Sequence, residues 1–250
     1  MIDITISSEH LGDCLEIMPS IPDKSIDMIL CDLPYGTTSC KWDTIVPFEP
    51  LWNQYERIIK DNGAIVLTAS QPFTSSLVMS NAKAFKFSWV WNKKFAGNFV
   101  LAKYQPQKIH EDILVFSYGT TIFNAQKSKR DVPCKKGANK DKIGAAIHIA
   151  NLKDEYKNKV YEFKEPESIL LFSSREGKRF HPTQKPVALF EYLIKTYTKE
   201  EAIVLDNCAG SFTTAIACLN TNRNYICIEK EEEYYKKGCQ RIIDWYSEDK

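Results

Sequence analysis

The sequence has no apolar run near the roughly 18 residues that a membrane-spanning helix requires. Its first residues, MIDITISSEH, do not show the basic and then apolar order of a signal peptide. These two absences predict a cytoplasmic protein with no membrane partner. The 250 residues are long enough for one large α/β domain or two small ones, with a core that needs no disulfide or metal to hold it.

Closely spaced metal ligands are also missing. The eight cysteines form no Cys-x-x-Cys pair, and the four histidines are scattered along the chain. Zinc sites usually draw on close pairs of such residues. Cys31 and Cys227 lie inside apolar runs, where a thiol behaves as a small hydrophobe. We therefore expect reduced, buried thiols and no bound metal, in preference to a metal site or a disulfide.

A strong net charge is absent, since the chain carries only +1, which excludes a protein that coats DNA with its whole surface. The charge is unevenly distributed, however. Residues 127–164 contain eleven Lys or Arg and five acids, so the rest of the chain is mildly acidic. The stretch 120–180 is rich in Lys and Asn and shows no sustained period, and we expect it to be a basic insertion.

Apolar runs and helical patterns alternate through the rest of the chain. Runs at 27–31, 64–69, 87–93, 112–119, 202–206 and 224–230 predict strands. Helical patterns occur at 51–59 (ended by Gly63), 186–198 and 213–220. This alternation predicts a mostly parallel sheet with helices on both faces. Asp32, Asp206 and Glu229 follow or end such strands, at the edge where ligands of α/β sheets bind.

The segment LDNCAGSFTTAIAC (205–218) runs from a strand through an Ala-Gly-Ser bend into a helix. Such a bend lets the backbone approach a ligand closely, although it lacks the Gly-x-Gly-x-x-Gly fingerprint. Glu229 lies 23 residues after Asp206, at a spacing where a carboxylate typically accepts hydrogen bonds from ribose hydroxyls. Together these features favour a cofactor that carries a nucleoside. Alternatively, Glu229 only opens the solvated helix face of the EKEEE run.

Two further segments are ambiguous when taken alone. In DMILCDLPYG (27–36) a buried strand stops at Asp32, Pro34 and Tyr35, which is compatible with an ordinary turn. HPTQKP (181–186) precedes an amphipathic helix and is compatible with an ordinary helix start.

Taken together and in this order, DLPYG, HPTQKP, DNCAGSFTT and CIE resemble the motifs of the β-class amino DNA methyltransferases. These enzymes methylate adenine N6 or cytosine N4 with S-adenosylmethionine. GDCLE (12–16), WNK (91–93) and HEDILVFSYG (110–119) extend the resemblance over nearly the whole chain. The catalytic motif precedes the charged insertion and the cofactor strand comes last, which is the circularly permuted β-class order. Asp, rather than Ser, at the first motif position is typical of the adenine-N6 members.

The resemblance implies an α/β, Rossmann-like methyltransferase fold with a seven-stranded, mostly parallel sheet. Residues 1–119 would form the catalytic half, 120–180 a basic target-recognition insertion, and 181–250 the cofactor half. The implied cofactor is S-adenosyl-L-methionine. Its implied ligands are Asp13, Cys14, His181, Thr183, Gln184, Lys185, Asp206, Cys208, Gly210, Ser211, Thr213 and Glu229.

The catalytic group implied by the resemblance is Asp32, Leu33, Pro34 and Tyr35. An exocyclic amino nitrogen is a poor nucleophile, because its lone pair is delocalised into the ring. The Asp32 carboxylate can accept one amino hydrogen, and the Leu33 carbonyl the other. Pro34 would stiffen the turn, and Tyr35 would stack on a base flipped out of the duplex.

The implied partner is double-stranded DNA, and the family also allows a homodimer and a cognate restriction enzyme. The candidate DNA-binding residues are Lys93, Lys94, Lys127, Lys129, Arg130, Lys135 and Lys136, whose charges can neutralise phosphates. Two departures stand out. Leu33 replaces the first proline of the tetrapeptide, and Phe212 replaces the second glycine of the Phe-x-Gly-x-Gly loop. Because Phe212 would place a bulky side chain beside the bend, a DNA-binding or partner subunit with weak catalysis is one alternative. Methylation of cytosine N4, or of RNA, is the other.

Overall fold

The structure is a computed structural model that describes residues 6–38, 40, 43–97, 99–136, 159–175, 180 and 183–247. The chain forms two compact units. The first comprises Met1–Asn124 and Ser168–Lys250, and the second comprises Ala125–Glu167, inside the predicted insertion.

The first half of the first unit contains β1 (Ser8–Leu11), α1 (Cys14–Ile17), the 3-10 helix η1 (Met18–Ser20), β2 (Ile26–Cys31), α2 (Phe48–Ile58), β3 (Ile59–Ala69), α3 (Phe73–Ser80), β4 (Phe85–Asn92), the 3-10 helix η2 (Phe99–Leu101) and β5 (His110–Phe116). Its second half contains β8 (Ile169–Leu171), α4 (Val187–Tyr197), β9 (Ile203–Asp206), α5 (Thr213–Asn220), β10 (Asn224–Glu229) and α6 (Glu232–Ser247). The second unit contains β6 (Ser128–Lys136) and β7 (Lys159–Lys164).

The described strands of the first unit form one eight-stranded sheet in the order β1-β10-β9-β2-β3-β5-β4-β8. The five strands from β1 to β3 are parallel neighbours, and β5 runs antiparallel to both β3 and β4. The predicted Rossmann-like, mostly parallel sheet is therefore confirmed. The sheet has eight strands where seven were expected, because the three-residue β8 adds itself in parallel to the edge strand β4.

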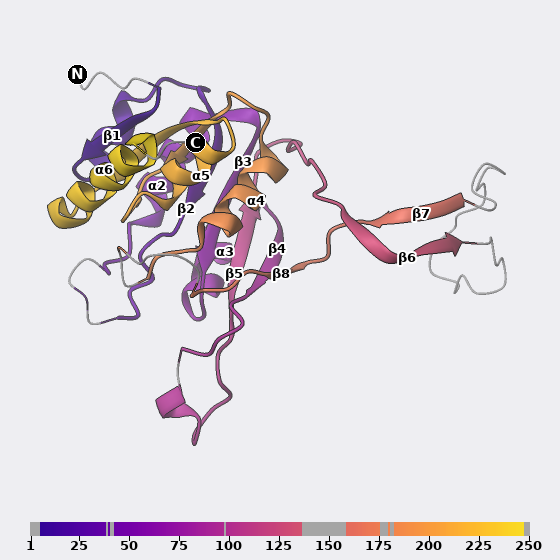
Figure 1. Ribbon diagram of the computed structural model, residues 1–250. Coiled ribbons are helices and arrows are strands. Elements are labelled where there is room, and N and C mark those ends of the chain that lie inside the picture. The colour runs from indigo at the N-terminus through magenta and orange to yellow at the C-terminus, as the bar shows by residue number, and fades with distance from the viewer. Residues whose placement is uncertain are drawn as a thin grey trace. The chain divides into compact units, whose positions relative to one another are not determined.

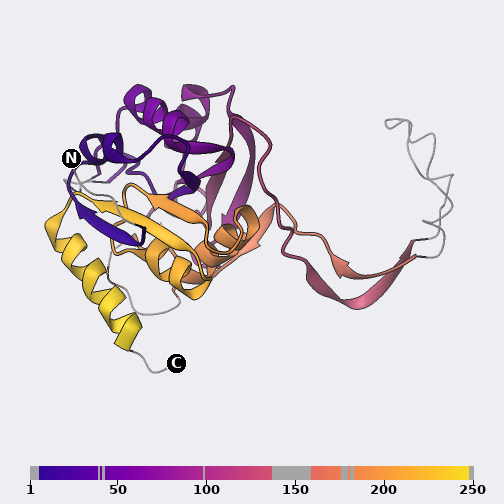
Figure 2. The same ribbon diagram turned by 90° about the horizontal axis from the view of Figure 1, so that it is seen from above.

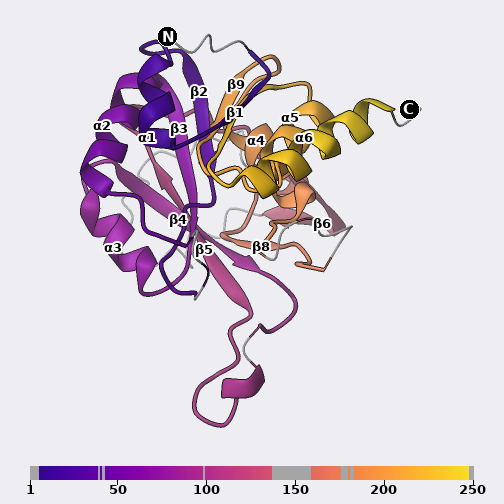
Figure 3. The ribbon, with the colours of Figure 1, turned by 90° about the vertical axis from the view of Figure 1, so that its left-hand side faces the viewer.

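Helices cover both faces of this sheet (Figure 1). Strand β2 shows why, since its successive side chains point to opposite faces. Ile29 packs in one buried cluster with Tyr55 of α2, and Leu30 packs in the other with Leu193 of α4. Figures 2 and 3 show α1 to α3 on one face and α4 to α6 on the other. Burial on both faces explains why the parallel strands read as continuous apolar runs.

Some boundaries differ from the sequence-based expectation. Helix α2 ends at Ile58, and Gly63 lies inside β3 beside a shift in the register with β2, so it does not end the helix. Elements β1, α1 and α3 carried no prediction, and α6 was foreseen only in the alternative of a solvated helix face opened by the EKEEE run. The first three have at most eight residues, which is too short for a clear hydrophobic period.

The second unit contains an antiparallel two-stranded ribbon of β6 and β7 where no periodic element was expected. Its register shifts between Lys129 and Cys134. Val132, Val160 and Phe163 are all exposed, so the ribbon has apolar side chains that no core covers. A ribbon that buries neither face need not alternate apolar and polar residues, which is why the pattern in the sequence is weak.

All eight cysteines are free, and Cys31 and Cys227 are buried as predicted. Within the part of the chain that the structure describes, no helix is both long and apolar enough to cross a lipid bilayer.

Candidate active site

The candidate site lies where the chain order of the sheet reverses. Strands β9 and β2 are parallel neighbours, although they come from opposite ends of the chain. Their carboxyl ends, with that of β10, border a pocket of about 1150 Å³. Such a switch point is where ligands bind in open α/β sheets. Glu229, Asp206 and Asp32 stand at the ends of these three neighbouring strands, and all three line the pocket.

Most of the predicted site residues meet in this pocket. Its lining includes Asp13, Cys14, Asp32, Leu33, Pro34, Tyr35, Lys93, Thr183, Gln184, Lys185, Asp206, Cys208, Gly210, Ser211, Thr213 and Glu229. His181 lies outside the described residues. Ligand pockets commonly enclose about 300–1,000 Å³. This one, at about 1150 Å³, lies just above the upper end of that range.

Asp32 is held by partners from three separate parts of the chain. Its Oδ1 accepts a hydrogen bond from the Tyr35 hydroxyl at 2.8 Å and a short one from the hydroxyl of Thr68 on β3. Its Oδ2 accepts from Lys185 Nζ at 2.6 Å. The Asp32 side chain keeps 21% of its surface exposed. The carboxylate is therefore fixed in direction and still open to the pocket.

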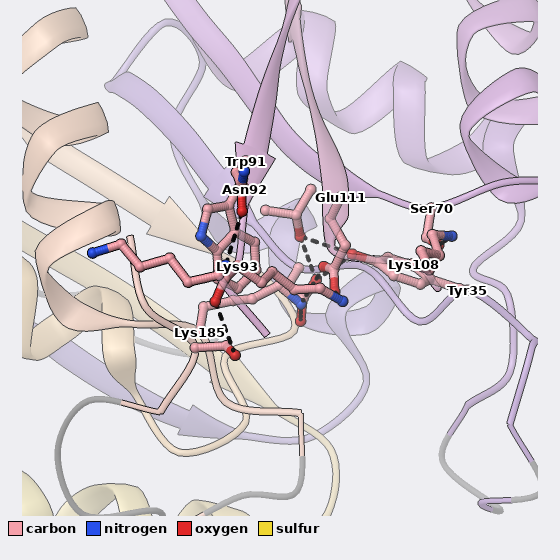
Figure 4. Close-up of polar contacts among 12 residues, drawn as sticks. Tyr35, Ser70, Trp91, Asn92, Lys93, Lys108, Glu111 and Lys185 are labelled. Atoms are coloured by element: carbon pink, nitrogen blue, oxygen red, sulfur yellow. Dashed lines mark hydrogen bonds and ion pairs between the residues drawn. The ribbon is translucent and has the colours of Figure 1, made fainter. Parts of the chain in front are cut away.

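Lys185 belongs to a row of alternating charges (Figure 4). Its ammonium lies 2.6 Å from Asp32 and 3.3 Å from Glu111 Oε2, and Glu111 Oε1 lies 3.0 Å from Lys93 Nζ. Burial acts to lower the pKa of Lys185, but the Asp32 and Glu111 carboxylates outweigh it and raise that pKa above its ordinary value. Burial acts to raise the pKa of Glu111, but Lys185 and Lys93 outweigh it and lower that pKa.

The Tyr35 ring stacks on Phe73, with 5.3 Å between the ring centroids and 24° between the planes. Burial and the Asp32 charge raise the pKa of Tyr35 well above its ordinary range, so its hydroxyl keeps its proton and donates. The predicted role of Tyr35 concerned only its ring. The structure adds a second contact, from its hydroxyl to the Asp32 carboxylate.

The turn after Tyr35 is tied down by Asp43. The Asp43 carboxylate accepts hydrogen bonds from the backbone N–H groups of Gly36, Thr37 and Thr38 at 2.7–2.9 Å. Gly36 has a φ of +66°, and a Cβ there would lie 2.9 Å from Ile45. Only glycine satisfies both conditions without strain. The segment from Asp32 to Tyr35 is thereby anchored at its far end.

On the other side of the pocket, Glu229 holds the Gly210 bend. Its Oε2 accepts from Gly210 N at 2.6 Å and its Oε1 from Glu231 N at 2.8 Å. Burial raises the pKa of Glu229. Asp13 caps α1 through Leu15 N at 2.9 Å. Each carboxylate oxygen can accept two hydrogen bonds, so both acids retain capacity for ligand hydroxyls.

Phe212 does not crowd the bend, so that expectation is wrong. It adopts a left-handed backbone conformation, with φ 60° and ψ 40°, in the place of the family's glycine. Its ring is fully buried and makes an edge contact with Tyr235 of α6. A Cβ on Gly238 would lie 2.5 Å from the ring, so Gly238 makes the space that Phe212 fills. The motive for expecting weak cofactor binding is thereby removed.

The sequence-based assignment missed Thr68, Glu111 and Arg241. Arg241 Nη1 donates to Ser211 O at 3.0 Å and to Thr213 Oγ1 at 3.1 Å, which secures the start of α5. Burial lowers the pKa of Arg241 to about 10. An arginine on the apolar face of a helix was a usable signal for this role. Glu111 lies within the HEDIL segment, whose resemblance to the family was noticed without a role for this residue.

The predicted DNA-binding residues fall in both units. In the first unit, Lys93 is engaged with Glu111, whereas Lys94 is exposed. In the second unit, Lys127 lies 2.6 Å from Glu165. There Lys129 is exposed and Arg130 Nε donates to a backbone carbonyl at 3.2 Å. The side chains of Lys135 and Lys136 lie outside the described residues. Their binding to phosphate stays a prediction.

A doubly wound sheet with a pocket at its switch point, bordered by acids on three neighbouring strands, places the chain in the Rossmann-like fold class. The chain belongs to the DNA methylase family, whose sequence profile matches residues 26–240. This membership confirms the resemblance to the amino DNA methyltransferases.

The chain is 28% identical over 246 residues to the DNA adenine methyltransferase YhdJ of Escherichia coli strain K12, covering 92% of this chain and 81% of that protein. Two solved structures share the fold. The PvuII DNA methyltransferase, which is cytosine-N4-specific, has a TM-score of 0.67 at 16% identity, covering 97% of this chain and 92% of that one. The M1.HpyAVI-SAM complex has a TM-score of 0.63 at 24% identity, covering 94% and 98%.

Proposed function

We propose that the protein is a sequence-specific DNA methyltransferase that transfers a methyl group from S-adenosylmethionine to N6 of a flipped-out adenine. One observation carries the proposal: the Asp32 carboxylate and the Gly210 bend border the same pocket from neighbouring strands. Membership of the DNA methylase family supports DNA as the substrate. The similarity to YhdJ, which is named an adenine methyltransferase, and the Asp at position 32 support adenine.

The chemistry of the pocket fits S-adenosylmethionine as the cofactor. Glu229 and Asp13 offer acceptors to ribose hydroxyls, and the Gly210 bend lets backbone approach the ligand. A related fold, M1.HpyAVI, was solved in complex with this compound. The cofactor would supply an electrophilic methyl group. Besides these three residues, we assign to its binding Cys14, Thr183, Gln184, Cys208, Ser211 and Thr213, with Asp206 acting only through the backbone that it holds.

The residues after β2 would prepare the amino group for attack. Asp32 accepts one amino hydrogen and the Leu33 carbonyl the other, which favours a pyramidal nitrogen with its lone pair free. This combines orientation with stabilisation of the positive charge that develops on nitrogen. Pro34 stiffens the turn, and Tyr35 contacts the base. A base stacked in a duplex cannot reach such a pocket, so the base must flip out.

The second unit and the exposed lysines would hold the phosphates. Lys129 and Lys94 present charges to solvent, and phosphate contacts of this kind weaken as salt concentration rises. A homodimer and a cognate restriction enzyme stay predictions of the family resemblance.

The test incubates the purified protein with radiolabelled S-adenosylmethionine and, separately, unmethylated genomic DNA and RNA, and then identifies the labelled nucleoside. We expect N6-methyladenine in DNA. Label in N4-methylcytosine would overturn the adenine assignment, and label only in RNA would overturn the DNA assignment. Cofactor binding without transfer would indicate a DNA-binding or partner subunit.

A further inference from the structure

The loop between β4 and β5, residues 93–109, projects beyond the ends of these two strands (Figures 1 and 3). Its base is closed by a backbone hydrogen bond from Lys93 N to Ile109 O at 2.8 Å, which continues the pairing of the strands. Its tip contains η2 and the turn that follows, where Tyr104 N donates to Leu101 O at 2.9 Å. The loop therefore has a paired stem and a tip that is folded by its own backbone.

Apolar side chains at this tip are exposed to solvent. Tyr104 keeps 85% of its surface exposed, Val100 72% and Leu101 46%. Leu101 lines the pocket that contains Asp32, whereas Val100 and Tyr104 do not. The tip therefore presents a tyrosine ring and a valine outside the pocket, next to a residue that borders it. Exposed apolar groups that gather at one place often mark a binding surface.

The charge of the loop is complementary to nucleic acid. Residues 93–109 contain four lysines and no acid, in a chain whose net charge is only +1. Lys94 and Lys103 are exposed, whereas Lys93 pairs with Glu111 at 3.0 Å. Cations beside exposed apolar groups fit a nucleic acid, whose phosphates flank its stacked bases. Two copies of this chain that met at the loop would instead bring like charges together, which is unfavourable.

A duplex that gives up a base to the pocket has a gap in its stack. Extrusion is unfavourable, because the base loses its stacking and its pairing. Apolar side chains that insert between bases can hold a duplex open, and an aromatic ring can stack on any base. The Tyr104 ring lies on the same turn as Leu101, which borders the pocket. A duplex that delivers a base to Asp32 therefore passes close to this ring.

We propose that the tip of loop 93–109 is a wedge that enters the DNA stack at the position left by the flipped base, with the Tyr104 ring stacked on a neighbouring base. The inference rests on the proposed function. Val100 contacts the same opened step, and Lys94 and Lys103 hold phosphates on either side of it. Tyr104 is thus a positioning residue, because it stabilises the opened duplex and touches neither the cofactor nor the reacting atoms.

The experiment compares Tyr104→Ala and Tyr104→Phe with the wild type. Single-turnover transfer from labelled S-adenosylmethionine is measured at saturating concentrations of unmethylated duplex genomic DNA. Tyr104→Ala should slow transfer about 5- to 100-fold, because the stacking on one base is lost. Tyr104→Phe keeps the ring and should stay within about twofold of the wild type. Tyr246→Ala is the matched control, because Tyr246 is 65% exposed on α6 and does not line the pocket.

The same DNA after heat denaturation separates a wedge from other roles of the side chain. A single strand has no duplex to open, so Tyr104→Ala should transfer to it within about twofold of the wild type. The Kd for the cofactor, measured by calorimetry, and the Tm should not change, because the Tyr104 side chain is largely exposed. If the wild type does not methylate single strands, the comparison of Tyr104→Ala with Tyr104→Phe on the duplex decides.

Three results would overturn the inference and leave the proposed function standing. They are a wild-type rate of Tyr104→Ala on the duplex, an equal loss on duplex and denatured DNA, and a loss in Tyr104→Phe as large as in Tyr104→Ala. In the first case, a change from dimer to monomer in sedimentation would assign the tip to a contact between two copies. A wild-type protein that transfers no label to duplex DNA overturns both the inference and the proposed function.

Discussion

Two aspartates end neighbouring parallel strands, and their surroundings are opposite. Asp32, after β2, is paired with the Lys185 ammonium and keeps 21% of its side chain exposed to the pocket. Asp206, at the end of β9, is 3% exposed and is bonded to neutral donors, the hydroxyl of Thr214 and the backbone N–H of Cys208. Burial, only partly offset by these hydrogen bonds, raises the pKa of Asp206 to about 7.

The contrast separates a carboxylate that a ligand can reach from one that the protein's own groups almost enclose. Asp32 has a compensating positive charge and open surface, so a ligand can reach it at little cost. Asp206 has neither, and its partners lie in the chain that follows it, Cys208 before the Gly210 bend and Thr214 in the first turn of α5. A carboxylate buried without a cation favours its neutral form. Asp206 therefore holds the backbone after β9, and Asp32 is the carboxylate that stays open to a ligand.

The first prediction compares the same substitution, Asp to Asn, at positions 32 and 206. The largest expected effect on the transfer rate is the one at position 32. Asp32→Asn should lower the rate of methyl transfer about 10²- to 10³-fold, because the carboxylate that accepts the amino hydrogen is lost. The Kd for S-adenosylmethionine should change little. Asp206→Asn, the matched control, should retain most of the transfer rate. Equal losses in both variants would contradict the division between the two aspartates.

The next largest expected effect is on thermal stability and concerns the packing of side chains behind the Gly210 bend. In Gly238→Ala the new methyl group would lie 2.5 Å from the Phe212 ring, and such overpacking costs about 1–3 kcal/mol. A loss of about 2 kcal/mol should lower the Tm by about 4–8 °C in a chain of this size.

Gly97→Ala is the control, because a Cβ at Gly97 has nothing within 4 Å. Replacing Phe212 by glycine as well should relieve the clash, since glycine tolerates the left-handed conformation. A Tm of Gly238→Ala equal to that of the wild type would show that the ring moves aside freely.

The fold was largely predictable because parallel strands buried on both faces leave apolar runs in the sequence, as in 27–31 and 202–206. The edge of the pocket was predictable too, because Asp32, Asp206 and Glu229 follow or end such runs. The contacts between side chains were not. Lys185 meets Asp32 across 153 positions of the chain, and no local pattern encodes that distance.

Phe212 is a second case in which a contact between distant residues could not be predicted from the sequence. The sequence reveals a bulky residue at a glycine position, but the direction of its ring depends on Gly238 in α6, whose packing against the Phe212 ring no local pattern reveals. Likewise, β6 and β7 form a ribbon with exposed apolar side chains and thus without the alternation that marks a half-buried strand. The sequence therefore missed long-range packing, together with short or exposed elements that have no clear hydrophobic period.

The pH dependence of stability offers a third comparison. The pKa of Asp206 is about 7 in the folded protein and should return to its ordinary value of 3.8 on unfolding. Its contribution to stability is therefore greatest below pH 3.8 and is lost as pH rises to 7. By linkage the wild type should lose about 2–3 kcal/mol from this group between pH 5 and 8. Asp206→Asn should lack that loss in urea titrations at the two pH values. An equal loss of stability between pH 5 and pH 8 in the wild type and in Asp206→Asn would contradict this prediction.

The smallest expected effects come from two threonines that donate to the two aspartates. Thr68 donates to Asp32 and Thr214 to Asp206, and both are fully buried, so valine replaces each without a change of shape. Thr214→Val removes the one side-chain hydroxyl that supports Asp206 and should lower stability by about 1–2 kcal/mol. Thr68→Val leaves Asp32 with Tyr35 and Lys185, so its Tm should change less, while transfer slows about 2- to 10-fold because the carboxylate loses part of its orientation. Melting curves and single-turnover rates of the two variants test this prediction. The two aspartates differ in role only if Thr214→Val loses mainly stability and Thr68→Val loses mainly transfer rate.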